Sequence, residues 1–183
     1  MRGKGAMSIQ PQLIVFTGLP GTGKSTLAEE AATLLRCPLF AKDQLEATLR
    51  RSGIGADANS GWAAVELLNM LAREQLRRGQ SAILDTVATF ERMREPWRVL
   101  ARTYGARLRI VECVCSDENL HRARLEVRQR GIPGWPELTW DDVLAVRSRF
   151  EPWSDPRLIL DATQPLAMNR AALRDYLLAD REK

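Results

Sequence analysis

The chain has 183 residues, 45% of them hydrophobic, which suffices for one well-buried core and is short for two full domains. Its 27 basic and 23 acidic residues leave a formal net charge of +4, which argues against a dedicated nucleic-acid binder. Three cysteines and a single histidine are too few for a typical zinc site, so reduced, buried thiols in a cytoplasmic protein are expected.

The start of the chain shows no pattern of a folded element. Residues 1–10 are expected to form a disordered leader and residues 11–183 a single domain, and Met7 is an alternative start to Met1. No stretch approaches the roughly 20 apolar residues of a membrane span, and no apolar segment of signal-peptide type follows Met1. The sequence therefore predicts a protein that has no membrane partner.

Hydrophobic runs alternate with helical segments through the rest of the chain. The runs rich in Ile, Leu and Val are typical of strands buried on both faces, and they span Gln12–Thr17, Pro38–Ala41, Ser81–Asp85, Arg107–Cys115 and Arg157–Asp161. Helical periodicity marks Lys24–Arg36, Asp43–Arg51, Gly61–Arg78, Phe90–Tyr104, Asp117–Arg130, Trp140–Phe150 and Pro165–Ala179. This alternation predicts an α/β fold of three layers, with helices on both faces of a parallel sheet.

Capping residues support several of these boundaries. Thr139 with Asp142, and Ser60 before Trp62, are predicted N-terminal caps. Two irregular pieces remain, at residues 52–60 and 131–138. In a nucleotide enzyme these are the places for lids and substrate loops, and in other proteins they are ordinary connections.

The most informative motif is Gly18-Leu19-Pro20-Gly21-Thr22-Gly23-Lys24-Ser25-Thr26, a P-loop that lies between an expected strand and an expected helix. Its backbone N–H groups and the positive end of the helix form a concave site for a polyphosphate. Lys24 is expected to reach the β- and γ-phosphates, and Ser25 to join the coordination sphere of Mg²⁺. The predicted nucleotide-binding residues are Gly18, Pro20, Gly21, Thr22, Gly23, Lys24, Ser25 and Thr26.

Two aspartates stand at the ends of expected strands, at the edge where parallel sheets bind ligands. Asp43 could take the proton of an acceptor hydroxyl, but with Glu46 three residues later it also fits a variant of the helix capping box. Asp85 resembles a Walker-B aspartate that holds the Mg²⁺ shell, and capping a turn is its alternative role. Thr86 follows Asp85 where an ATPase would have a glutamate, which favours transfer to a substrate.

A run of arginines occupies the helix expected before Gly131, namely Arg122, Arg124, Arg128 and Arg130. Arg124 and Arg128 are four residues apart, so they are expected to share a helix face and to bind one anion together. A solvated basic face is the ordinary explanation of such a run. The Gly- and Pro-containing stretch that follows favours a lid at about residues 129–138, whose closure brings guanidinium groups onto the phosphates.

Two further residues receive structural interpretations. His121 has no obvious acidic or thiol companion and is interpreted as a surface residue. Trp135 could cover a substrate from the lid, although packing under the loop is the more common role of such a residue.

In combination, these residues resemble a known group, the small P-loop kinases related to the 5′-kinase domain of polynucleotide kinase, in the neighbourhood of shikimate, gluconate and adenylate kinases. The likeness runs from Leu13 to about Asp161 and rests on the GLPGTGKST loop, the aspartate after the second strand, the ILDT and VECV strands, and the RFEPW segment of Arg149–Trp153. It implies a five-stranded parallel sheet in the order 2-3-1-4-5, with ATP and Mg²⁺ as cofactors.

The same resemblance implies roles for single residues. Asp43 would be the general base or would orient the acceptor, and Asp85 would lie near the metal or the acceptor. Arg124 and Arg128 would be lid arginines, with Arg124 also touching the nucleotide. The segment from Asp161 to Gln164 would lie beside the adenine.

One difference from that group concerns the acceptor. There a basic residue follows the catalytic aspartate within a few positions, whereas Asp43 is followed by Gln44-Leu45-Glu46, and Glu46 would repel a nucleic-acid phosphate. We therefore expect a kinase for a hydroxyl of a small molecule, with a 5′-hydroxyl polynucleotide kinase and a nucleotide-binding regulatory NTPase as alternatives. Neither the acceptor nor the oligomeric state follows from the sequence, because a fold and a phosphate site do not determine the substrate pocket.

Overall fold

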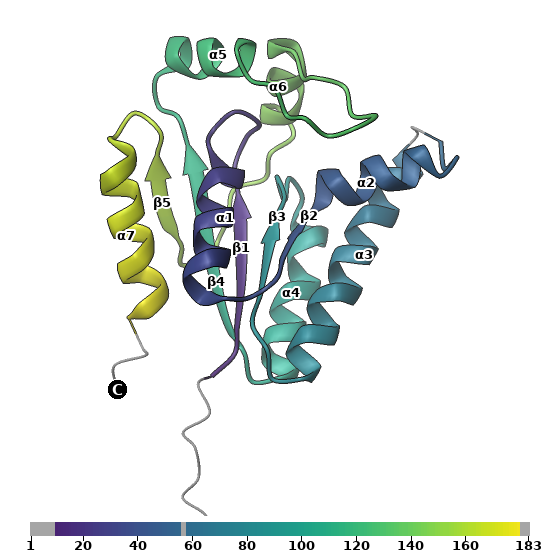
Figure 1. Ribbon diagram of the computed structural model, residues 1–183, viewed down its shortest axis with the longest axis vertical. Helices are drawn as coiled ribbons and strands as arrows, with labels where there is room; N and C mark the ends of the chain where they lie inside the picture. Colours follow the sequence, from purple (N-terminus) through teal and green to yellow (C-terminus); the bar gives the residue numbers. More distant parts are fainter. Residues whose placement is uncertain (1–9, 56–57, 180–183) are drawn as a thin grey trace, which may run out of the picture.

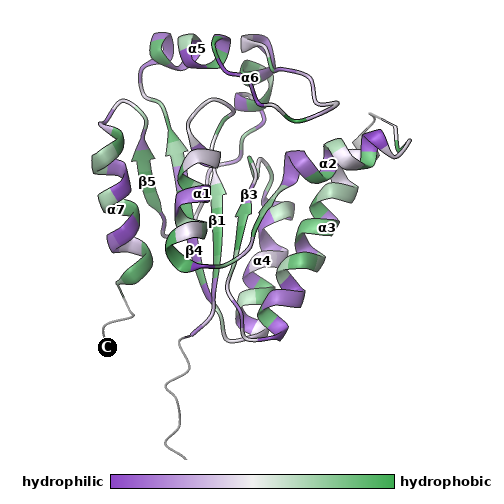
Figure 2. Cartoon of the chain, in the orientation of Figure 1, coloured by the Kyte–Doolittle hydropathy of each residue, from purple (hydrophilic) through white to green (hydrophobic). Residues whose placement is uncertain are grey.

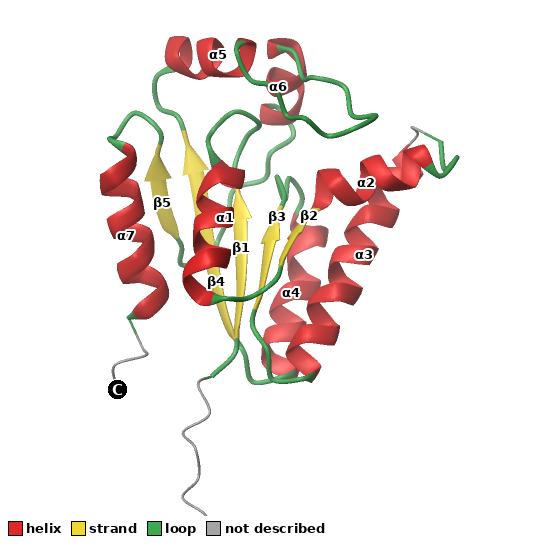
Figure 3. Cartoon of the chain, viewed as in Figure 1, coloured by secondary structure: helices red, strands yellow, loops and turns green. Residues whose placement is uncertain are grey.

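The computed structural model of the protein describes residues 10–55 and 58–179, so most of the predicted leader lies outside the described residues. Strands and helices alternate as the sequence predicts (Figure 3). In chain order they are β1 (Gln12–Thr17), α1 (Lys24–Leu35), β2 (Leu39–Ala41), α2 (Lys42–Arg51), α3 (Ala58–Arg77), β3 (Ala82–Asp85), α4 (Glu91–Thr103), β4 (Arg107–Val114), α5 (Glu118–Glu126), α6 (Trp140–Arg147), β5 (Leu158–Asp161) and α7 (Leu166–Leu178). None of the described helices combines the length and the apolar composition that crossing a membrane requires.

The strands form one parallel sheet in the order β2-β3-β1-β4-β5, which confirms the predicted topology. Central β1 pairs with β3, where Phe16 stands opposite Asp85, and with β4, where Thr17 stands opposite Glu112. Because all strands run in one direction, their carboxyl ends meet at one edge of the sheet, and α5 and α6 lie over that edge (Figure 1). Ligands of open α/β sheets bind there.

Helices cover both faces of the sheet, as predicted. Leu13 and Val15 of β1 pack with α3 and α4, whereas the alternate residues Ile14 and Phe16 pack with α1 and α7. Successive side chains of a strand point to opposite faces, so a strand covered on both sides must be apolar at consecutive positions. This is why β1 and β3 are hydrophobic along their length (Figure 2).

The start of α3 corrects one predicted cap and the start of α6 confirms another. α3 begins at Ala58, so Ser60 lies inside the helix, where its hydroxyl donates to Glu46 Oε1 at 3.2 Å. At α6 the predicted capping box is present, because Thr139 Oγ1 accepts from the backbone N–H of Asp142 and the Asp142 carboxylate accepts from that of Thr139. Ser60 was mistaken for a cap because its buried partner lies on another helix.

The end of α5 also differs from the prediction. The helix ends at Glu126, and Arg128 and Arg130 lie beyond it in an irregular segment. Val127, which follows the last helical residue, is 82% exposed, so α5 has no apolar packing at that position. Short helices depend on such packing for most of their stability.

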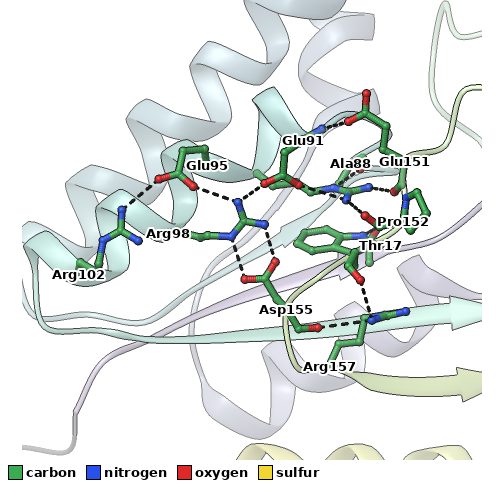
Figure 4. Close-up of polar contacts among 12 residues, drawn as sticks. Thr17, Ala88, Glu91, Glu95, Arg98, Arg102, Glu151, Pro152, Asp155 and Arg157 are labelled. Atoms are coloured by element: carbon green, nitrogen blue, oxygen red, sulfur yellow. Dashed lines mark hydrogen bonds and ion pairs between the residues drawn. The ribbon is translucent and has the colours of Figure 1, made fainter.

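A buried arginine on α4 holds the RFEPW segment, whose Glu151 and Pro152 are labelled in Figure 4, against the sheet. Arg94 is fully buried and donates to the carbonyl oxygens of Pro152, at 2.9 Å, and of Glu151. The ring of Trp153 lies 4.1 Å from this guanidinium, and its Nε1 donates to Thr17 Oγ1 at 3.3 Å. Thr17 is the last residue of β1, so the segment is tied to the strand that leads into the P-loop.

Candidate active site

Glycines shape the loop between β1 and α1. Gly18 has φ of +125°, and a Cβ added to it would lie 2.0 Å from the carbonyl oxygen of Cys113. Gly23, the N-cap residue of α1, has φ of +89° and contributes no side-chain cap, and no acidic residue lies in the first turn. The first N–H groups of α1 are therefore left to an anion, which the positive end of the helix favours.

Lys24, the first residue of α1, is buried beneath this loop. Its Nζ donates to the carbonyl oxygen of Leu19 at 2.9 Å. Burial lowers the pKa of the ammonium from its ordinary value, and the charges of Asp85 and Asp43 act against that shift. A polyphosphate in the loop would further stabilise the charged form, because an opposite charge nearby favours ionisation.

His121 lies on α5 and is only 1% exposed, so its interpretation as a surface residue is wrong. Its Nε2 lies 2.7 Å from the carbonyl oxygen of Pro20, and its ring meets that of Trp140 edge-on, with centroids 5.1 Å apart. Burial lowers the pKa of His121, so the neutral ring donates from Nε2 to Pro20. The ring is buried by the loop and α6 together, and a periodicity within α5 alone could not reveal this.

A cavity of about 370 Å³ lies beside the loop and is lined by Gly18, Cys113, His121 and Arg147, among other residues. It contains none of the residues predicted to act on the acceptor or the metal. Burial raises the pKa of the Cys113 thiol to about 12, so this cysteine is the inert thiol that the sequence predicts.

A second cavity, of about 170 Å³, lies beside Ser25 and is called the α2 cavity here. Its walls come from α1, β2, α2, β3 and the segment after α5, and they include Ser25, Asp43, Asp85, Arg128, Arg130 and Ile132. Four residues predicted from separate parts of the sequence, Ser25, Asp43, Asp85 and Arg128, are therefore brought to one place.

Ser25 and Asp85 offer oxygen ligands of the kind that Mg²⁺ prefers. Both line the α2 cavity, and both also line a space of about 20 Å³ together with Lys24. Within residues 10–55 and 58–179, no three or more His, Cys, Asp or Glu side chains are grouped so that they could hold a metal. The donor set therefore fits an ion that takes most of its ligands from phosphate oxygens and water.

Asp43 lies in the first turn of α2 but does not cap that helix. The N-cap is Ala41, without a side-chain hydrogen bond, and Glu46 is buried between Lys42 and Arg50, with which it forms ion pairs. The capping-box alternative is therefore wrong. Since two cations neutralise Glu46, the prediction that it would repel a nucleic-acid phosphate also loses its physical basis.

The Asp43 carboxylate forms an ion pair with Arg130. Burial alone would raise the pKa of Asp43, but the charges of Arg130 and Lys42 outweigh it and hold the pKa below its ordinary value. Asp43 is therefore an ionised hydrogen-bond acceptor at neutral pH. Arg130 was only one of four arginines in the predicted run, and nothing in the sequence indicated that it would be the one to pair with Asp43.

The two predicted lid arginines, Arg124 and Arg128, line different cavities. Because α5 ends at Glu126, the argument that they share a helix face is wrong. Arg128 lines the α2 cavity, where burial and the nearby charge of Arg130 lower its pKa. Arg124 lines a cavity of about 240 Å³, called the α7 cavity here, whose walls include Gly21, Thr26, Ala162, Gln164 and Leu166.

The α7 cavity lies where the resemblance implies an adenine. Ala162 and Gln164 line it, whereas the Asp161 carboxylate is turned to the backbone N–H groups of Ser116 and Thr163, at 3.2 and 3.0 Å. Asp161 thus holds the turn after β5 in shape. A contact of its own side chain with the nucleotide remains a prediction.

The predicted lid segment packs on α2. Gly134 approaches Arg51 so closely that an added Cβ would lie 3.1 Å from Arg51 Cγ, and the ring of Trp135 lies 4.5 Å from the guanidinium carbon of Arg50. In Figure 1 this loop extends from α5 and α6 toward α2. The segment therefore forms a wall beside the α2 cavity, and Trp135 packs under it.

Solved structures of known proteins share this fold. A provisionally named kinase of Chloroflexus aurantiacus j-10-fl is 26% identical, with a TM-score of 0.73 over 92% of this chain and 99% of the other. A gluconokinase of Sinorhizobium meliloti 1021 is 19% identical, with a TM-score of 0.68 over 94% and 95% of the two chains. The Mycobacterium tuberculosis APS kinase CysC, in complex with AMPPNP and APS, is 18% identical, with a TM-score of 0.67 over 92% and 98%.

These neighbours confirm the fold and the resemblance to small P-loop kinases. No curated protein sequence matches the chain. A family model described as an AAA domain, AAA_33, matches residues 13–152, which include the P-loop, both aspartates, α5 and most of the RFEPW segment. The chain belongs to this AAA domain family.

Proposed function

We propose that the protein is an ATP- and Mg²⁺-dependent kinase that transfers the γ-phosphoryl group to a hydroxyl of a small-molecule acceptor. The observation that carries the proposal is the α2 cavity, where Ser25, Asp43, Asp85 and Arg128 meet beside the P-loop. The names of the structural neighbours support it, since they include a gluconokinase and an APS kinase with both a nucleotide analogue and its acceptor bound. The family match is compatible with this reading.

The residues of the candidate site have different roles in phosphoryl transfer. This reaction depends on positioning and charge stabilisation more than on covalent chemistry. The P-loop amides and Lys24 bind the phosphates, and Ser25 and Asp85 hold the metal. Bound Mg²⁺ would neutralise charge on the phosphate oxygens. Arg124 and Arg128 add positive charge from two different cavities beside the loop.

Asp43 accepts a hydrogen bond from the acceptor hydroxyl. A carboxylate whose pKa is lowered is a weak base, but phosphoryl transfer through a loose transition state removes the hydroxyl proton late. Its main task is then to orient the oxygen, and it takes the proton as the new bond to phosphorus forms.

The size of the α2 cavity favours a small acceptor. Its volume of about 170 Å³ is below the ~300–1,000 Å³ of pockets that take drug-sized ligands. In a 5′-hydroxyl polynucleotide kinase, only the end of a nucleic-acid strand would need to enter the α2 cavity. A regulatory NTPase would need no acceptor. The test must therefore distinguish these two alternatives from a small-molecule kinase.

The test is a screen for acceptor-dependent release of ADP from Mg·ATP, across sugars, nucleosides, antibiotics and oligonucleotides. A small-molecule kinase releases ADP only in the presence of one class of small acceptor. Activity confined to oligonucleotides would support the polynucleotide alternative. Hydrolysis that no acceptor accelerates, together with a partner affinity that depends on the nucleotide, would support the regulatory alternative and contradict the proposal.

A further inference from the structure

A buried guanidinium with free donors lines the α2 cavity. The Arg130 side chain is only 9% exposed, and its Nη2 donates to Asp43. Its Nε and Nη1 are buried and have no hydrogen-bond partner in the described part of the chain. Buried donors are nearly always satisfied in folded proteins, because an unpaired buried donor loses its hydrogen bonds to water without replacement, and the cost is larger when the group is charged. Because Arg130 lines the α2 cavity, a ligand bound there could satisfy these two donors.

The surroundings of Arg130 favour an anion as that ligand. Arg128 is close enough that the charge of Arg130 adds to burial in lowering its pKa, while the carboxylates of Asp85, Asp43 and Glu137 act against that shift. The two guanidinium groups therefore repel each other in a partly dry place. The Trp135 ring lies 5.9 Å from the Arg130 guanidinium carbon, and Glu137 accepts the backbone N–H of Arg130 at 2.9 Å. The guanidinium is therefore held in position, and an oxyanion would relieve the repulsion and satisfy the free donors.

We propose that the acceptor carries an oxyanion, a carboxylate or a phosphate group, in addition to the hydroxyl that is phosphorylated, and that Arg130 binds this oxyanion. The inference rests on the proposed kinase function. It assigns Arg130 to the acceptor because Arg130 and Asp43 line the same cavity with Gln44 and Ile132, whereas the α7 cavity, lined by Arg124 and Gln164, has no such pair.

The ion pair of Arg130 with Asp43 couples binding of the oxyanion to the reaction. An oxyanion on Nε and Nη1 of Arg130 shares the guanidinium charge with the Asp43 carboxylate on Nη2, which weakens that ion pair and lets Asp43 accept a hydrogen bond from the acceptor hydroxyl. The hydroxyl oxygen forms a bond to the γ-phosphorus as the bond from that phosphorus to the β,γ-bridging oxygen breaks. The electron pair leaves with ADP, and the hydroxyl proton passes to Asp43 and then to water.

The test measures binding, so it does not depend on turnover. The full chain is loaded with Mg²⁺ and AMPPNP, which fill the P-loop, and is titrated by calorimetry with glycerate, glycerol 3-phosphate and glycerol. These probes share a three-carbon polyol frame and differ in the anionic group. Since charge-assisted hydrogen bonds are the strong ones, we expect at least one anion to bind about tenfold or more tightly than glycerol. Whichever anion binds more tightly identifies the carboxylate or the phosphate as the preferred group.

Arg130→Gln should remove the preference for the anion. Arg122→Gln is the matched control, because Arg122 is an exposed arginine of α5 that pairs with Glu126, and it should keep the preference. Arg130→Lys, which retains the charge with fewer donors, should give an intermediate preference, and the melting temperature of each variant checks that it folds.

Equal affinities for the three probes, or a preference that survives Arg130→Gln, would overturn the inference. The inference would also be overturned if Arg130→Gln lost affinity for AMPPNP but not for ADP and still preferred the anion. Arg130 would then bind the γ-phosphate of the nucleotide. Failure of the proposed kinase function looks different. It would show as no acceptor-dependent ADP release, whatever the anion binding.

Discussion

His121 Nε2 on α5 lies 2.7 Å from the carbonyl oxygen of Pro20, which joins the helix before the lid segment to the P-loop. Both groups are buried at this contact, so water cannot replace the hydrogen bond if it is broken, and breaking it costs free energy. The position of α5, which carries Arg124, is thereby coupled to the conformation of the loop.

Replacing His121 by Ala should destabilise the protein and weaken nucleotide binding together. The substitution leaves the Pro20 carbonyl without its partner and opens a gap under α5, so we expect a loss of about 2–4 kcal/mol in the free energy of unfolding. Urea denaturation and ADP titration measure the two effects. Arg122→Ala, at the exposed neighbouring position, should change neither. If His121→Ala kept the wild-type affinity for ADP, the coupling between α5 and the loop would be disproved.

Asp43→Asn should reduce turnover and leave nucleotide affinity nearly intact. The amide keeps the shape of the side chain but cannot take the acceptor proton, so we expect a decrease of roughly 10²–10⁴ in kcat. Acceptor-dependent ADP release gives the rate, and ADP titration gives the affinity. Asp175→Asn, on the exposed surface of α7, is the control for loss of a carboxylate. Full activity of Asp43→Asn would remove Asp43 from the mechanism.

Gly18→Ala should be far more damaging than Gly79→Ala. Both glycines have positive φ, +125° and +70°, but an added Cβ at Gly18 meets the Cys113 carbonyl oxygen at 2.0 Å, whereas nothing lies within 4 Å at Gly79. The left-handed conformation alone costs a non-glycine residue about 1–2 kcal/mol, which is the loss expected for Gly79→Ala. Thermal unfolding should show a much larger loss for Gly18→Ala. Similar melting temperatures for the two variants would contradict the close approach of β4 to the loop.

Arg94→Met should destabilise the protein by about 3 kcal/mol or more, because it leaves several buried carbonyl oxygens without a donor. Arg94 is fully buried and donates to Ala88, Glu151 and Pro152. Arg102→Met is the control, since Arg102 is an exposed arginine on the same helix, and its effect should stay within about 0.5 kcal/mol. Denaturant titration of both variants makes the comparison. Equal effects would mean that Arg94 does not anchor the RFEPW segment.

The pH dependence of stability should include a contribution from Asp161. Burial by itself would raise the pKa of Asp161, but hydrogen bonds from Ser116 and Thr163 lower it to about 2. A carboxyl group whose pKa is lower in the folded state stabilises the protein above its unfolded pKa of 3.8, and that contribution disappears as the pH falls toward about 2.

Asp161 is half-buried at the surface, and solvent screening reduces the expected contribution to about 1 kcal/mol. Denaturation of Asp161→Asn across the acidic range should show a correspondingly weaker loss of stability than the wild type. Parallel curves for the two proteins would show that the turn after β5 does not depend on this carboxylate.

The sequence alone determined the fold class and the location of the site. The P-loop is a local pattern whose glycines and following helix suffice to shape it, so its place could be predicted from one segment. Asp43 and Asp85 could be located because they stand at the carboxyl ends of apolar strands, and the carboxyl ends of parallel strands must meet at one edge. Consecutive apolar residues in β1 and β3 indicated burial on both faces and therefore a parallel sheet.

Only the tertiary structure decided which charged and polar groups meet inside that site. Because α5 ends at Glu126, Arg124 and Arg128 line different cavities. The burial of His121 depends on the loop and α6. The pairing of Asp43 with Arg130 joins two segments 87 residues apart. Residues far apart in the chain make these contacts. The periodicity of one helix or strand cannot predict which side chains of other elements will contact it.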